Sequence, residues 1–208
     1  LEGTTVELMK MGEPGVPEMN AYIEEVLKEG ETLGFDGRVV SVGEGEGYAA
    51  IARKKNAKVN YQVDLIDEIW EDRPVLSEEP AFDLDVKYAG ETVASKLARI
   101  REEMKQAGTN VHVVSTIDDI CWTLNIRGND IDFFPLVLSY GIITMDSFEL
   151  YIDEKKLDDK LKAKLAKDGV NLHPYNDIYE DVKKFGSDVV AMIDPGKLNY
   201  ALFNNCLL

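Results

Sequence analysis

The two histidines are the first residues to consider, because imidazole is a common base and metal ligand near neutral pH. His112 lies inside an apolar run, and His173 directly precedes a proline and a tyrosine. Neither has a second histidine or a carboxylate at the spacing of a metal-binding motif. His112 is therefore expected to be a core or interface residue, and His173 to fix a loop. On this basis the sequence predicts no metal site and no catalytic residue.

Motifs for phosphate binding and for nucleophilic catalysis are also weak. Residues 43–47 read Gly-Glu-Gly-Glu-Gly, which has the wrong glycine spacing for a dinucleotide loop and two carboxylates that would repel an anion. We expect a flexible turn there, ahead of a helix at 48–55. Ser115 and Ser139 have no neighbouring base, and Cys121 stands among apolar residues, which predicts a buried, unreactive thiol.

One segment, 118–130, combines an amphipathic start with a polar turn that contains Arg127, Asn129 and Asp130. Two interpretations remain open for it. Asn and Asp favour turns, Gly128 could adopt positive φ, and Arg can bind carbonyls, so the turn could be purely structural. Alternatively, the arginine could bind a carboxylate of a ligand. The chemistry of the residues alone favours the structural interpretation.

Composition narrows the class of partners. The chain carries 39 acidic and 23 basic residues, for a formal net charge of -16. Such a charge disfavours binding to nucleic acid and to anionic membranes. The cysteines, Cys121 and Cys206, form no paired pattern, no apolar run approaches the length of a membrane span, and the start does not resemble a signal peptide. We therefore predict a cytoplasmic protein with reduced thiols, and the opening Leu1 leads us to expect a fragment.

The elements that must position these residues are clearest in the second half. Apolar periodicity and turn signals there predict alternating strands and helices, with a hairpin at 144–147. Strands are expected at 111–115, 136–143, 148–152, 170–172 and 189–193, and helices at 92–107, 118–124, 157–167, 178–185 and 198–203. The alternation predicts an α/β fold with a mixed sheet flanked by helices.

The first half shows the same alternation with fewer strands. Strands are expected at 5–9, 32–35 and 59–63, helices at 19–27 and 48–55, and a helical turn at 65–70. A polar stretch with two prolines follows and predicts a linker. We expect a partial domain at 1–73, a linker at 74–90 and a complete domain at 91–208.

Several long motifs resemble one family. Residues 115–130 are similar to the stretch "DDIAWLLNLRGSDI" in the second domain of the long, three-domain Xaa-Pro aminopeptidases, and Pro135 and Ser139-Tyr140 follow in the matching order. His173-Pro174-Tyr175 also resembles that family, and residues 63–74 look like its "NLVDxIWxDRP" stretch. The resemblance spans essentially the whole chain.

This resemblance implies a creatinase/prolidase N-terminal type of fold, which is ribonuclease H-like, with one complete copy preceded by a partial copy. In the family a further pita-bread domain binds two divalent metal ions, usually manganese, and removes the N-terminal residue that precedes proline. The sequence contains no match to that catalytic domain. The chain is therefore expected to be inactive alone and to bind no cofactor, while the parent is a metalloaminopeptidase.

For partners and sites, the resemblance implies a scaffold, dimerisation and substrate-access role. The expected partners are the missing C-terminal catalytic domain, a second copy in a homodimer and, in the parent, a peptide substrate. Arg127, Asn129 and Asp130 resemble the part of the second domain that faces the active-site cleft, which makes them substrate-entrance candidates. The alternative is a stand-alone peptide- or protein-binding module of creatinase-like fold without catalysis, with which the net charge is equally compatible.

Overall fold

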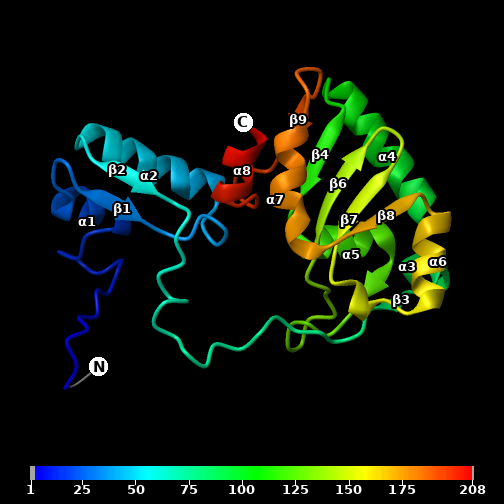
Figure 1. Cartoon of the computed structure of the whole chain (residues 1–208), viewed down its shortest axis with the longest axis horizontal. Coiled ribbons are helices and arrows are strands. Elements are labelled where there is room, and N and C mark those ends of the chain that lie inside the picture. Colours follow the sequence, from blue (N-terminus) through cyan, green and yellow to red (C-terminus); the bar gives the residue numbers. More distant parts are fainter. Residues whose placement is uncertain (1–2, 208) are drawn as a thin grey trace.

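A five-stranded mixed sheet forms the centre of the larger of two regions in the computed structural model, which describes residues 3–207 (Figure 1). Its strands are β4 (Val111–Val114), β6 (Tyr140–Thr144), β7 (Phe148–Tyr151), β8 (Val170–His173) and β9 (Ala191–Met192), in the order β8-β7-β6-β4-β9. The pairs β4–β6 and β6–β7 are antiparallel, whereas β7–β8 and β4–β9 are parallel. The predicted mixed α/β sheet and its hairpin are confirmed.

Helices cover both faces of this sheet. On one face lie α4 (Val93–Gln106), α5 (Ile117–Leu124) and α6 (Asp159–Lys167), and on the other lie α7 (Ile178–Asp181) and α8 (Tyr200–Cys206). Successive strand residues serve opposite faces, as the pleat requires: Ile143 packs with the first group and Ile142 with the second. The sheet therefore separates two apolar cores.

Local sequence explains where the longest helix begins and ends. The Thr92 hydroxyl accepts a hydrogen bond from the Ser95 amide and caps α4. Its buried residues Val93, Leu97 and Met104 recur at helical spacing and face the core. Gly108, at φ 70°, follows the helix in the left-handed conformation that glycine adopts without strain. The helix predicted from this pattern is confirmed.

Short elements complete the larger region. They are β3 (Phe82–Asp83), α3 (Val86–Ala89), β5 (Ile126–Arg127) and the 3-10 turns Glu154–Lys156, Tyr175–Asp177 and Val182–Lys184. Strands β3 and β5 pair antiparallel, and Ala81 is buried in the core beneath α4 and α5. Within the predicted linker 74–90, residues 74–81 form one continuous stretch without helix or strand, whereas β3 and α3 occupy most of the remainder.

The smaller region contains α1 (Met19–Val26), β1 (Thr32–Gly34), α2 (Val42–Lys54) and β2 (Lys58–Asn60). Strands β1 and β2 are parallel and form a two-stranded sheet. Its core consists of Leu27, Ile51 and Ala52, and α1 has no buried residue. Figure 1 shows this region beside the larger one, with α8 between them and the extended segment near residue 75 running below.

The two regions are joined by backbone hydrogen bonds to the segment 195–201. Four amide-to-carbonyl distances of 2.8–2.9 Å make this joint: Val42 to Leu198, Gly43 to Pro195, Tyr200 to Val40, and Ala201 to Gly37. The Tyr200 ring packs against Phe35 and Tyr61, with ring centroids 5.7 and 5.2 Å away. The smaller region is therefore docked onto the start of α8.

Two predictions for the smaller region were wrong. Residues 5–9 form no strand, because the exposed side chains of this segment, Val6 and Leu8 among them, meet no partner strand within 3–207. The glycine-rich stretch 43–47 is not a flexible turn but the first part of α2. Ser41 and Glu44 form a reciprocal capping box that starts the helix at Val42.

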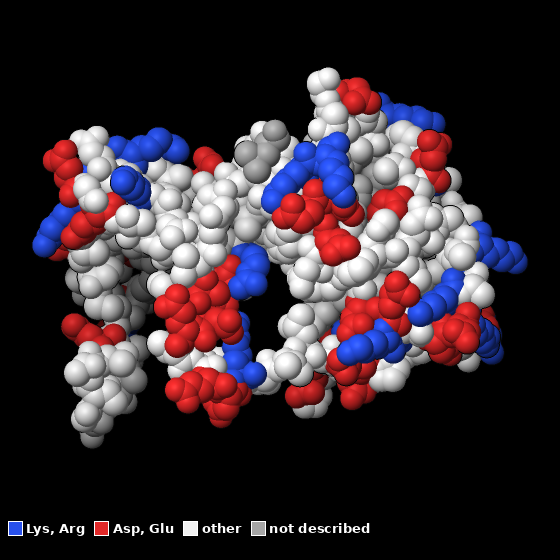
Figure 2. All heavy atoms as spheres, viewed as in Figure 1, with Lys and Arg blue, Asp and Glu red and all other residues white. Residues whose placement is uncertain are grey.

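The surface of this fold mixes both signs of charge. Figure 2 shows acidic and basic side chains interspersed over the visible face of both regions. Across residues 3–207, no helix has the length and apolar character needed to cross a membrane.

Candidate functional site

Arg127 lies on β5, at the start of the polar turn predicted from the sequence. Its guanidinium Nη1 donates to the carbonyl oxygens of Cys121 at 2.9 Å and Ile126 at 2.8 Å. The side chain is half-buried and ties the turn to the end of α5. Arg127 therefore has the structural role that the sequence suggested, which is to donate hydrogen bonds to backbone carbonyls.

Asp130 takes part in a buried ion pair. Its Oδ2 accepts from Lys156 Nζ and from the Leu138 amide, each at 2.6 Å. The side chains of Asp130 and Lys156 are only 1% and 3% exposed. Asp130 Oδ1 is buried with no hydrogen-bond partner among residues 3–207. Removing either charge would leave the other buried and unpaired, which is expensive in a low-dielectric interior.

Asn129 is the exposed member of the three candidates. Its neighbour Gly128 is buried, and a Cβ there would lie 2.6 Å from Val137 Cγ2. Gly128 does not have positive φ, so close packing, not turn geometry, requires glycine at this position. The structure thus brings Arg127, Asn129 and Asp130 into one turn but leaves only the Asn129 side chain largely open to solvent.

Lys96 supports this turn and was not singled out from the sequence. It is 1% exposed, and its Nζ donates to the Trp122 carbonyl and to Asn125 Oδ1, both at 2.6 Å. The ammonium also lies 4.3 Å from the centroid of the Trp122 ring. Burial lowers the pKa of Lys96. The sequence did contain a signal for the burial of this lysine, because it stands three residues after Val93, on the apolar face of a helix.

Asn125 connects the buried Lys96 to the turn through hydrogen bonds of its side chain. It ends α5 in the left-handed conformation at φ 52° and is 1% exposed. Its Nδ2 donates to the Glu91 carbonyl at 2.9 Å, while its Oδ1 accepts from Lys96. Lys96, Asn125 and Arg127 together fix the path of the chain from α5 into β5.

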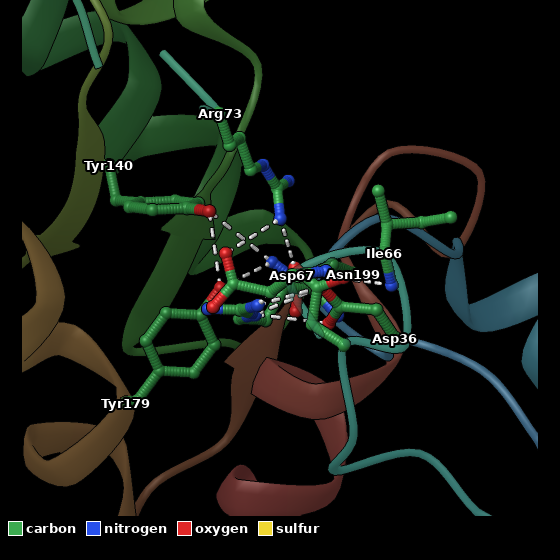
Figure 3. A network of polar contacts seen from close by, with 9 residues as sticks. Asp36, Ile66, Asp67, Arg73, Tyr140, Tyr179 and Asn199 are labelled. Carbon is green, nitrogen blue, oxygen red and sulfur yellow. Dashed lines mark hydrogen bonds and ion pairs between the residues drawn. The ribbon is translucent and has the colours of Figure 1, made fainter. Parts of the chain in front are cut away.

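A second polar cluster lies where the two regions meet (Figure 3). Arg38 bonds Asp36 at 2.8 Å and Asp64 at 3.1 Å, and Arg73 bonds Asp64 at 2.6 Å and Asp67 at 3.4 Å. The Arg73 guanidinium, helped by backbone amides, holds the pKa of Asp64 below its usual value. The two arginines thus hold β1, β2 and the start of the linker together.

Tyrosine hydroxyls from the larger region face this cluster. The hydroxyls of Tyr140 and Tyr179 are 3.2 Å apart, and Asn199 Nδ2 donates to Tyr179 at 3.0 Å. Burial is the main cause of the raised pKa of both tyrosines, so both stay protonated through the physiological range. These groups can therefore position a ligand or hold the junction, and they form no base–nucleophile pair.

Two adjoining cavities open along the linker. One, of about 570 Å³, lies against the arginine–tyrosine cluster, and the other, of about 720 Å³, lies beside the Asp130–Lys156 pair. Val75, Leu76, Tyr175 and Asn176 line both. Volumes of this size are typical of small-molecule or peptide sites. The second cavity has Leu138, Ile152 and Lys156 among its walls.

The two histidines lie in separate places on the sheet. His112 Nδ1 is 3.1 Å from the Met192 carbonyl, and His173 Nε2 is 2.6 Å from Glu149 Oε2. Burial alone would raise the pKa of Glu149, but hydrogen bonds from Ser147, His173 and Asn171 outweigh it and lower the pKa. Within 3–207, no group of three or more His, Cys, Asp or Glu side chains is placed to hold a metal ion.

The cysteines are free thiols in different surroundings. Cys121 is 1% exposed, and its Sγ accepts from the Val137 amide at 3.4 Å. Burial raises the pKa of Cys121 and brings that of Cys206 to about 11. Both thiols are thus mostly protonated and weakly nucleophilic at neutral pH, as predicted for Cys121.

Comparison with a family model gives a match over residues 72–207, described as the Creatinase/Prolidase N-terminal domain. Among curated proteins, Aminopeptidase P2 of Arabidopsis thaliana is 35% identical over 95% of this chain and 28% of its own length. A probable Xaa-Pro aminopeptidase P of Sordaria macrospora is 37% identical over 95% of this chain and 33% of its own. The chain spans about a third of the length of these relatives.

A solved structure is similar over nearly the same extent. It is the X-prolyl aminopeptidase of Caenorhabditis elegans, described as a cytosolic enzyme with a di-nuclear active site. The TM-score is 0.86 and the identity 33%, over 94% of this chain and 33% of that one. The fold of both regions is therefore shared with the front part of a much longer protein.

Proposed function

Because the chain belongs to the creatinase/prolidase N-terminal domain family and matches the N-terminal region of Xaa-Pro aminopeptidases, we propose that it is the non-catalytic front region of such an enzyme. The observation that carries this proposal is the structural likeness over nearly the whole chain to one third of an X-prolyl aminopeptidase. The parent would remove the N-terminal residue that precedes proline.

Catalysis, in this proposal, belongs to a further C-terminal region like those of the longer relatives. Two divalent metal ions, manganese by the family pattern, would be bound there. The residues described in this chain then have supporting roles: scaffold, contribution to a homodimer, and control of substrate access. A cytoplasmic location is part of the same proposal, and the cytosolic description of the Caenorhabditis elegans relative supports it.

The division of the chain follows from the same proposal. Residues 1–73 would form part of a first creatinase N-like domain and residues 91–208 a second one, with 74–90 between them. The two-stranded sheet of the first part and the five-stranded sheet of the second support two units. The burial of Ala81 beneath α4 and α5 indicates that the end of the connecting stretch packs with the second unit.

Substrate access would involve the turn that contains Arg127, Asn129 and Asp130. Asn129 is exposed and could contact a peptide directly, whereas Arg127 and Asp130 would hold the turn in shape through their carbonyl and lysine partners. In the complete enzyme, Arg127→Ala should raise KM for short Xaa-Pro peptides more than it lowers kcat. An unchanged KM would show that this turn has no role in substrate access.

A stand-alone peptide- or protein-binding module is the second candidate. The two adjoining cavities favour it, because together they offer a groove along Val75 and Leu76 with both apolar and polar walls, which suits a peptide. The reading frame beyond Leu208 separates the candidates. Two Asp, one His and two Glu in a pita-bread sequence there would support the peptidase, and a stop codon would support the module.

A further inference from the structure

The loop 131–135 presents aromatic side chains to solvent. Phe133 is fully exposed, at 101% of its reference area, and Phe134 is 61% exposed. Ile131, beside them, is 37% exposed. Single apolar residues on a surface are ordinary, but two adjacent exposed phenylalanines with an isoleucine form a patch of the kind that marks contact sites.

The backbone of this loop is strained at the most exposed residue. Phe133 has φ 67°, a left-handed conformation that bulky residues rarely adopt. Ile131 and Phe134 form an isolated bridge, and the Phe134 amide donates to the Ile131 carbonyl at 3.1 Å, so Phe133 stands inside a tight turn. Glycine or asparagine is the usual choice at such a position. A phenylalanine there has a cost in the folded chain, and no burial offsets it.

The base of the loop is held rigidly. The Asp130 amide donates to the Leu136 carbonyl at 3.2 Å, and the Gly128 amide to the Pro135 carbonyl at 3.4 Å. The Asp130–Lys156 ion pair lies directly beneath. The loop therefore offers its aromatic tip in one preorganised geometry, which reduces the entropy lost on docking.

The size of the patch limits what can cover it. A buried aromatic side chain removes about 150–250 Å² from solvent, so the two phenylalanines supply roughly 400 Å² on this side. A free partner usually needs about 1,000 Å² of total buried area or more for a specific complex, which is about 500 Å² on each side. A patch this small is better suited to a tethered partner, for which the linkage supplies a high effective concentration.

We propose that the loop 131–135 is the docking contact for a further region of the same polypeptide, which receives Phe133 and Phe134 in a concave apolar pocket. The relatives carry two thirds of their length outside the part that this chain matches, so a tethered region of that kind exists in them. The proposal rests on the proposed function, because it requires the longer polypeptide. It also places the contact beside Asn129, at the proposed substrate entrance.

Thiol labelling tests the contact directly. Phe133→Cys is introduced into the 208-residue chain and into the product of the complete reading frame, and maleimide labelling rates are compared. We expect labelling about tenfold slower or more in the longer protein, because a covered thiol reacts poorly. Val39→Cys, at a position that is 77% exposed in the smaller region, is the matched control and should label equally in both. The unsubstituted proteins give the background from Cys121 and Cys206.

A second variant should change Tm in opposite directions in the two proteins. Phe133→Gly relieves the left-handed strain and should raise the Tm of the 208-residue chain by about 2 °C. In the longer protein the same change should lower Tm, because the anchor is lost. Equal labelling of the Phe133→Cys variant in both proteins, a Tm increase in both, or a reading frame that adds no further region would overturn the proposal.

These outcomes are independent of peptidase activity. Protection of the introduced thiol in a longer protein that does not hydrolyse Xaa-Pro peptides would keep the contact and reject the proposed function. Hydrolysis by a longer protein whose introduced thiol labels freely would support the proposed function and reject the contact. If the thiol of the Phe133→Cys variant becomes protected in the 208-residue chain as its concentration rises, the patch is an interface between copies, which also contradicts the proposal.

Discussion

The two regions of the molecule reach stability by different means. The larger has a five-stranded sheet with an apolar core on each face, whereas the smaller has two paired strands and a core of Leu27, Ile51 and Ala52. Val42, at the start of α2, packs in a core of the larger region. The smaller region therefore depends on docking against α8, and the larger region does not depend on the smaller one to the same degree.

Phe148→Ala should have the largest effect and should break the larger region. Phe148 is completely buried on β7 and also closes against Gly141, where a Cβ would lie 2.6 Å from the ring. Truncating a buried phenylalanine costs about 3–5 kcal/mol. Urea unfolding should show this loss, while Val39→Ala at an exposed site leaves the midpoint unchanged. A loss below about 1 kcal/mol would show that the sheet is not the stabilising unit.

Lys156→Met should destabilise the larger region by about 3 kcal/mol, because Asp130 is left buried and charged without its partner. The double variant Lys156→Met with Asp130→Asn removes both charges and should recover part of the loss. Chemical denaturation of the two variants measures the difference. A double variant less stable than Lys156→Met alone would contradict the account of this pair.

Tyr200→Ala should release the smaller region and leave the sheet intact. Its ring lies against Gly45, at which a Cβ would come within 2.3 Å, and against Tyr61. Amide exchange in α2 should become about tenfold faster, which corresponds to about 1.4 kcal/mol, while exchange in β6 and β7 stays unchanged. Tyr88→Ala, at an exposed site, is the control. Faster exchange throughout the sheet would mean that the two regions unfold as one.

Ser41→Ala should have a smaller effect, confined to the start of α2. Ser41 Oγ accepts from the Glu44 amide, and the Glu44 carboxylate accepts from the Ser41 amide at 3.1 Å. Loss of such a cap costs about 1 kcal/mol. Hydrogen exchange of the first turn of α2 should increase, and Ser187→Ala, at an exposed turn position in the larger region, serves as the serine control.

The smallest effect should be the acid response of Glu149. Hydrogen bonds hold its pKa below the ordinary value in the folded state, so its contribution to stability is present above the unfolded-state pKa, 4.5. That contribution is lost as pH falls through the folded-state value. The stability difference between the wild type and Glu149→Gln should be constant from pH 7 to about 5.5 and shrink below it. A difference that grows on acidification would contradict this sign.

Local signals in the sequence predicted most of the larger region. Apolar periodicity between Val93 and Met104, with Thr92 before it and Gly108 after it, was sufficient for α4. The hairpin of β6 and β7 followed from strand alternation around a short polar turn. These features depend on residues close together in the chain, and each level of the pattern agrees with the others.

Features that depend on distant partners were not predictable in the same way. The Asp130–Lys156 pair joins residues far apart in sequence, and neither residue differs from an ordinary surface charge until both are buried together. The helical start of α2 was missed because its glycines outweighed the Ser41–Glu44 capping signal. The left-handed backbone at Phe133 has no signal in the sequence, since phenylalanine is a residue type that disfavours it.

The most direct test of the account is a hydrolysis assay with an Xaa-Pro peptide and manganese. The 208-residue chain and the product of the complete reading frame are compared at equal concentration, and release of the N-terminal residue is followed. We predict no release by the 208-residue chain and turnover by the longer protein. Release by the 208-residue chain alone would contradict the claim that this region is non-catalytic.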